Sequence, residues 1–222
     1  YIKDINMDDV VQMMIGREIG ERYPHRDAKI GEEVIRVENL SSGKKFHDVS
    51  FSVKAGEVLG VAGLMGAGRT EIMQAIFGNL PTDSGKIYIE GKEVAIKNPR
   101  QAIANGIGFI TEDRKTEGLL LEKSIAENIE IANLGKVSGS GVLNPKKQAE
   151  LVKNGIEEFR IKCFGPDHEC NNLSGGNQQK VVLAKWIYTD PKILILDEPT
   201  RGVDIGAKKE IYNVINDMAA KG

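Results

Sequence analysis

The sequence contains few cysteines and no excess of charge of either sign. Two cysteines among 222 residues exclude a disulfide framework. Thirty basic residues stand against 32 acidic ones, for a net charge of -2. This balance argues against a nucleic-acid partner, because domains that neutralise phosphates are usually clearly basic.

Long apolar runs are also missing. None approaches the roughly 20 residues that a membrane-spanning helix needs, and the first residues have neither the charged nor the apolar region of a signal peptide. We therefore expect a cytoplasmic protein. Because 41% of the residues are hydrophobic, the chain can bury one sizeable core.

A phosphate-binding loop is the feature around which the chain is organised. The pattern G-x-x-x-x-G-K-[ST] cradles phosphates with backbone N–H groups and holds Mg²⁺ with its hydroxyl. An apolar run over 57–62 predicts a buried strand before the loop, and 71–77 predicts a helix after it, so that the anion would lie at a helix N-terminus. Arginine replaces the usual lysine. The residues concerned are Gly63, Leu64, Met65, Gly66, Ala67, Gly68, Arg69, Thr70 and Glu71.

Alternating apolar residues predict an early antiparallel layer. Strands are expected at 34–40 and 49–53, and a hairpin at 86–89 and 94–96. Asn98 and Pro99 form an N-cap signal for a short helix, after which 108–110 predicts a core strand.

From about 116 to 186 the pattern is helical, which indicates an inserted helical subdomain. Helices are expected at 124–129 and 145–159, with a flexible loop at 135–141 between them. The core then resumes with a buried strand at 192–196 and a last helix at 205–220.

Two acids end that buried strand. Asp197 can orient Mg²⁺, and Glu198 can polarise the water that attacks a terminal phosphate. Asp197 and Glu198 could be solvated acids at the end of a strand, without a role in chemistry. The phosphate-binding loop earlier in the sequence favours a catalytic role for them.

A third motif supplies a family resemblance. Residues Leu173, Ser174, Gly175, Gly176, Asn177 and Gln178 resemble the L-S-G-G-Q signature of the ATP-binding-cassette ATPases. The stretch 199–204, ending at Asp204, is similar to the family's D-loop at the dimer seam. The combinations GLMGAGRTE, TEDRK and LSGGNQQKVVLAKW are similar to the second of two fused cassettes in bacterial simple-sugar importers of the ribose and galactose type.

The resemblance implies an α/β fold: a P-loop NTPase with a parallel-sheet core, an antiparallel β subdomain and an inserted helical subdomain. It also implies ATP and Mg²⁺ as ligands. Residues 34–222 would form the nucleotide-binding domain, truncated at its C-terminus. Residues 1–33 would be a helix, at 7–15, and a linker that follow a preceding cassette.

The resemblance also implies several protein partners. The signature would serve the ATP of a first cassette in the same polypeptide, or of a second copy. Membrane permease subunits would dock on the helical subdomain and near 112–115, and a sugar-binding protein would be an indirect partner. The domain would lie peripherally on the inner face of the membrane.

Departures from the family pattern concern the domain's own ATP site. Arg69 is a planar fork on a longer stem than lysine, and Glu112 stands where the family has the Q-loop glutamine. Phe46 and His47 lie near the place of the adenine-stacking tyrosine. We therefore expect ATP binding with slow turnover here, and a signature that completes the partner cassette's site.

Two other readings stay open. A non-transport cassette protein acting on the ribosome or DNA would carry a basic arm or a charged insertion, and the sequence has neither. A purely regulatory nucleotide sensor is favoured by Arg69 and disfavoured by Glu198.

Overall fold

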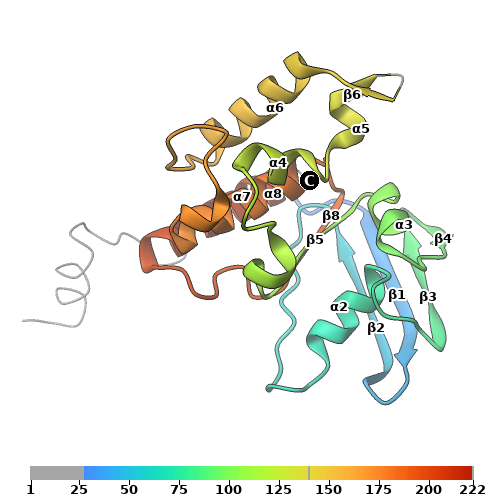
Figure 1. Cartoon of the computed structure of the whole chain (residues 1–222). Coiled ribbons are helices and arrows are strands. Elements are labelled where there is room, and N and C mark those ends of the chain that lie inside the picture. The colour runs from blue at the N-terminus through green and yellow to red at the C-terminus, as the bar shows by residue number, and fades with distance from the viewer. Residues whose placement is uncertain (1–27, 140, 222) are drawn as a thin grey trace, which may run out of the picture.

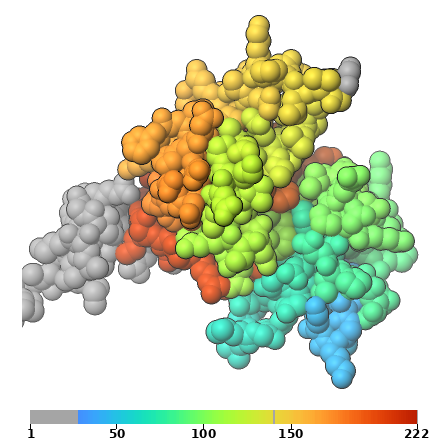
Figure 2. Space-filling view, in the orientation of Figure 1, coloured from blue at the N-terminus to red at the C-terminus, as the bar shows by residue number. Residues whose placement is uncertain are grey.

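The computed structural model describes residues 28–139 and 141–221. The helix predicted at 7–15 and most of the linker after it lie outside the described residues. The chain forms two lobes, a β-rich one at the blue and teal end of the colour scale and a helical one in yellow and orange (Figures 1 and 2).

The β-rich lobe is built on a four-stranded antiparallel sheet, as the alternating pattern predicts. Its order is β2-β1-β3-β4. Ile35, Val37 and Leu40 are buried on one face of β1, which pairs with both neighbours. The strands are β1 (Glu33–Ser42), β2 (Phe46–Lys54), β3 (Ser84–Ile89) and β4 (Lys92–Val94).

The parallel core consists of β5 (Ile107–Ile110) and β8 (Ile193–Leu196), which pair residue by residue. Helix α3 (Pro99–Ala104) leads into β5. Its N-cap is Asn98, as predicted, whose side chain accepts a hydrogen bond from the Gln101 N–H. Because the β5–β8 pair is parallel, the acids after β8 and the residues after β5 leave the sheet at the same edge.

The predicted strand before the phosphate loop is wrong. Residues 57–62 form no strand, and Val58, Leu59 and Val61 are each more than 40% exposed. A strand needs a neighbour to complete its ladder of hydrogen bonds. An apolar groove separates this segment from β8, so the segment runs extended without a partner strand among the described residues.

The insertion after β5 is mainly helical but not wholly so. The flexible loop predicted at 135–141 instead contains the end of α5 (Leu134–Val137) and the first strand of a short β-hairpin, which consists of β6 (Ser138–Gly139) and β7 (Val142–Leu143). The remaining elements are the π-helical turn η2 (Arg114–Gly118), α4 (Ile125–Glu130), α6 (Pro145–Glu158), the 3₁₀ turn η3 (Cys170–Asn172) and α7 (Gly175–Ile187).

Two hydrophobic clusters hold the lobes together. One joins the antiparallel sheet, β5 and helix α2 (Arg69–Ile76), and the other joins α4, α7 and helix α8 (Ile205–Lys221). Trp186 of α7 packs against both. Within the described part of the chain, no helix combines the length and apolar character needed to cross a bilayer.

Candidate functional site

The phosphate loop has the backbone geometry of an anion cradle. Gly66 and Gly68 have φ angles of 79° and 83°, which favour glycine. A side chain at Gly68 would also come within 2.9 Å of the Lys45 carbonyl oxygen. Helix α2 starts directly after this glycine and has no side-chain cap. Its first-turn N–H groups are therefore available to a phosphate.

The acid pair lies where the parallel strands end. The Asp197 N–H donates to the Ile110 carbonyl, 2.9 Å away, which extends the β5–β8 ladder by one step. The Asp197 Oδ2 atom is buried and has no hydrogen-bond partner. Glu198 turns out of the strand with φ 45° and is exposed. A buried, unpaired carboxylate oxygen fits a water-bound cation, as the sequence predicts for Asp197.

The described residues contain no cluster of three or more His, Cys, Asp or Glu side chains able to hold a metal ion. Mg²⁺ does not require one, because it keeps several waters and usually binds through one or two carboxylates plus substrate phosphates. Asp197 and the half-buried Thr70 therefore fit this ion.

The off-pattern Arg69 contacts Glu198. Its Nη2 atom lies 4.0 Å from Oε1 of Glu198. The two side chains come from the start of α2 and the end of β8, so the loop and the acidic strand meet as predicted. The contact between Arg69 and Glu198, however, could not be predicted from the two sequence motifs.

The signature begins α7, where Ser174 is the N-cap residue. The Ser174 side chain caps no N–H group; instead its Oγ accepts a hydrogen bond from the Asn177 amide. Asn177 also accepts from the Lys162 N–H. Leu173, Gly176 and Gln178 are buried, whereas Ser174 is exposed and accessible to a ligand.

Glu112 follows β5, at the sheet edge where Asp197 follows β8. It forms an ion pair with Arg201 of the 199–204 stretch, the candidate D-loop. Asp204 caps α8, accepting a hydrogen bond from the Ala207 N–H at 3.0 Å. Glu112 therefore lies beside the candidate D-loop, and the phosphate loop leads into α2 in the β-rich lobe (Figure 1).

Phe46 is buried in the core of the β-rich lobe, so it cannot stack on a base, whereas His47 beside it is exposed. Sequence reasoning missed Arg114, which contacts both the signature helix and the D-loop. The charged TEDRK segment was the only signal of its presence.

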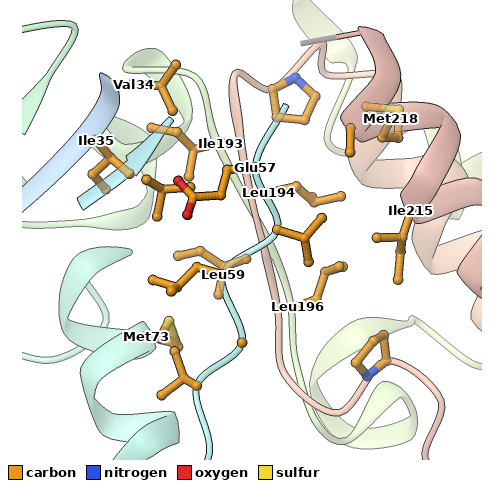
Figure 3. Close-up of a pocket in the computed structure, with 18 of the residues that line it drawn as sticks. Val34, Ile35, Glu57, Leu59, Met73, Ile193, Leu194, Leu196, Ile215 and Met218 are labelled. Carbon is orange, nitrogen blue, oxygen red and sulfur yellow. The ribbon is translucent and has the colours of Figure 1, made fainter. Parts of the chain in front are cut away.

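The groove between residues 57–61, β8 and α8 has a volume of about 570 Å³. Its lining is largely apolar: Leu194, Leu196 and Ile215 lie on one side of the extended segment, and Leu59 and Met73 lie on the other (Figure 3). Such a lining offers few groups that could orient a polar ligand. Arg69, Asp197 and Glu198 lie among the groove's lining residues, and we place the polar chemistry with them.

A sequence profile described as "ABC transporter" matches residues 46–201. The chain belongs to the ABC transporter family. The ribose import ATP-binding protein RbsA of Geobacillus kaustophilus is 57% identical over 221 residues, and that of Bacillus subtilis is 53% identical. In each case all of this chain is matched, but it spans only 45% of the relative's length.

Solved structures agree on the fold. The ADP conformation of an ATP-binding cassette of an ABC transporter shares 28% identity at a TM-score of 0.68, covering 86% of this chain and 78% of the other. A dimeric post-hydrolysis cassette bound to ADP and Pi has a TM-score of 0.71 at 20% identity, covering 84% and 83%. The predicted P-loop NTPase fold of the ABC type is confirmed.

Proposed function

We propose that this chain is an ATPase domain that couples ATP binding and hydrolysis to the import of a simple sugar. The curated relatives support this reading, because they are ribose import ATP-binding proteins and match the chain over its whole length. Since the chain spans less than half of each, the transport activity is assigned to the larger protein of which such a domain forms part. Residues 34–222 are the nucleotide-binding domain in this proposal, and residues 1–33 join it to a preceding cassette.

ATP binds at Gly63–Glu71, and Mg²⁺ is held by Thr70, Asp197 and the phosphates. When bound, the ion neutralises charge that develops on the phosphate oxygens. Glu198 orients the attacking water and withdraws its proton. The Arg69 guanidinium contacts this carboxylate and stabilises its unproductive, ion-paired state. The distance between these two side chains is the observation that carries the proposal of a slow site.

The signature serves a second site. Ser174 and the N-terminus of α7 contact the ATP of a partner cassette, either the first cassette of the same polypeptide or a second copy. The support is the exposure of Ser174 together with the tight packing of the glycines behind it. Asp204 lies at the seam between the two cassettes.

Permease subunits dock on the helical lobe and near 112–115, which places the domain on the cytoplasmic face of the membrane. Apolar side chains in the 131–143 stretch support this assignment: Ile131, Leu134, Val142 and Leu143 are 47%, 46%, 71% and 46% exposed. Exposed apolar groups gathered in one stretch are typical of contact surfaces. A sugar-binding protein delivers the substrate to the permease and does not touch this chain.

A coupled-enzyme ATPase assay on the purified chain tests the slow site. We expect binding of a fluorescent ATP analogue with slow Mg²⁺-dependent turnover, and no turnover in Glu198→Gln. Turnover comparable to that of an intact cassette pair would contradict the proposal.

The complete transport ATPase tests the signature. There, Ser174→Ala should lower sugar-stimulated hydrolysis, and unchanged hydrolysis would mean that the signature is idle.

A regulatory nucleotide sensor is the second candidate, favoured by the Arg69–Glu198 contact. The same assay separates the two. Binding of the analogue without any turnover, in the chain and in the complete protein carrying an inactive first cassette, would favour the sensor.

A further inference from the structure

Arg114 lies near the start of the insertion that follows β5. It opens the π-helical turn that follows β5, and Asp113 fixes this turn by accepting hydrogen bonds from the Lys115 and Thr116 N–H groups, at 2.8 and 3.4 Å. These hydrogen bonds fix the backbone around Arg114 independently of any contact that its side chain makes.

The guanidinium of Arg114 donates to two different motifs. Nη1 lies 2.8 Å from the Arg201 carbonyl oxygen and Nη2 lies 3.3 Å from that of Gly202, both in the D-loop. Nε lies 3.3 Å from Oε1 of Gln178, in the first turn of α7. A planar fork with five N–H donors can serve three acceptors at once, which an ammonium on a flexible stem does less well.

The acceptor on α7 is itself fixed. Gln178 is buried, and its amide donates to the Cys170 carbonyl at 3.0 Å. The link from Arg114 therefore ends on the core of the helical lobe and not on a mobile surface side chain.

The signature glycine makes room for this link. A Cβ atom at Gly175 would lie 2.6 Å from the Arg114 Nη2 atom and 3.0 Å from the Gly202 carbonyl oxygen. The absence of a side chain at Gly175 thus lets the guanidinium and the D-loop approach the start of α7 together.

We propose that Arg114 is a positioning residue that ties the D-loop to the start of the signature helix, so that these two motifs keep one relative orientation. The ion pair of Glu112 with Arg201 attaches the same segment to the D-loop a second time. Residues 112–114 therefore form the common anchor of both motifs. Under the proposed function, these are the surfaces that the partner cassette meets, and Arg114 sets the angle between them.

Hydrogen–deuterium exchange on the purified chain tests the tie without reference to function. Arg114→Ala removes three hydrogen bonds whose donor is charged, and such bonds are stronger than those between neutral groups. We expect amides in 199–206 to exchange at least about tenfold faster, with residues of the antiparallel sheet unchanged. Arg100→Ala, which removes an exposed arginine from α3, is the matched control. Wild-type exchange rates at 199–206 in Arg114→Ala would overturn the proposal.

Arg114→Lys keeps the positive charge but removes the planar guanidinium, so it separates the effect of the guanidinium geometry from that of the charge. It also serves as the second variant if Arg114→Ala folds poorly. Lysine cannot reach all three acceptors, so exchange at 199–206 should again accelerate. Lysine rates equal to wild type would show that a positive charge suffices and would overturn the role of the fork.

The functional arm uses the complete two-cassette ATPase. Because Arg114 is assigned no contact with nucleotide, Arg114→Ala should lower kcat about tenfold with an unchanged KM, and millimolar guanidinium should restore part of the rate. An unchanged kcat in a wild-type protein that does hydrolyse ATP would overturn the positioning role. Absence of hydrolysis in the wild type would instead refute the proposed function. The exchange experiment alone would then test whether Arg114 links the D-loop to the signature helix.

Discussion

The Nη2 atom of Arg69 lies 4.0 Å from Oε1 of Glu198, so the phosphate loop contacts the acid that follows β8 in the same chain. The two side chains are 33% and 46% exposed. Solvent screens a pair this open, and exposed ion pairs contribute at most about 1 kcal/mol. The contact can slow a reaction that needs a free Glu198 carboxylate, but it is too weak to abolish that reaction.

Arg69→Lys should therefore accelerate ATP turnover at this site. An ammonium at position 69 can point to the phosphates and leave Glu198 free to orient water. Release of about 1 kcal/mol corresponds to a rise in kcat on the order of five-fold. The measurement is single-site hydrolysis by the purified chain. Arg69→Ala is the control and should lose affinity for ATP, while a lower kcat in Arg69→Lys would refute the inhibitory contact.

Gly176→Ala should destabilise the junction of α7 and α8. The new Cβ would lie 2.8 Å from the Ala207 Cβ, closer than two methyl groups can pack. Overpacking of this kind costs about 1–3 kcal/mol, which outweighs the gain of up to about 1 kcal/mol in helix propensity. Gly135→Ala on α5 is the matched control, because open space surrounds that position and only the propensity gain remains. Urea unfolding compares the two, and equal stabilities would contradict the close packing.

Asn128→Ala should destabilise the helical lobe. Asn128 is fully buried; its Oδ1 accepts from the Leu120 N–H at 2.8 Å, and its amide donates to the Leu120 and Ser124 carbonyls, both at 2.9 Å. Truncation leaves the backbone groups of Leu120 without these bonds, at a cost of about 2–4 kcal/mol. Asn154→Ala on the exposed face of α6 should change the unfolding free energy by less than about 0.5 kcal/mol. Equal losses in the two variants would disprove the structural role of Asn128.

Local patterns carried most of the fold. Alternation located β1 and β2, and the Asn98–Pro99 signal located α3, because each depends on neighbours in sequence. The strand expected at 57–62 failed because strand formation also requires a partner elsewhere in the chain. The β6–β7 hairpin was missed because its strands are only two residues long, too short to show a period.

The site divides in the same way. The positive-φ glycines of the phosphate loop and the position of Asp197 at a strand end follow from motif and local context. The contacts of Arg69 with Glu198 and of Glu112 with Arg201 join residues 129 and 89 positions apart, from the numbering in each pair. A one-dimensional pattern gives no distance between such residues, so their charges could be noted but not paired.

The two cysteines should differ sharply in reactivity. Cys170 is fully buried and its sulfur accepts a hydrogen bond from the Asn128 amide at 3.3 Å, whereas Cys163 is half-buried. Burial raises the pKa of the Cys170 thiol from 9.0 to about 11, so at pH 8 it is protonated and a poor nucleophile. A chromogenic thiol reagent at pH 8 should therefore find one reactive thiol in the native chain and two after unfolding.

The variant Cys163→Ser identifies the fast-reacting thiol, because the folded variant should react only at the rate at which the helical lobe opens.

The raised pKa of Cys170 also makes the stability of the fold depend on pH. The folded state retains the Cys170 proton between pH 9 and about 11, where the unfolded state loses it, so this thiol's contribution to stability is full below pH 9 and declines as the pH rises through that window. In Cys170→Ala the free energy of unfolding should therefore fall less between pH 9 and about 11 than in the wild type. An unchanged pH profile would show that Cys170 titrates normally in the folded chain.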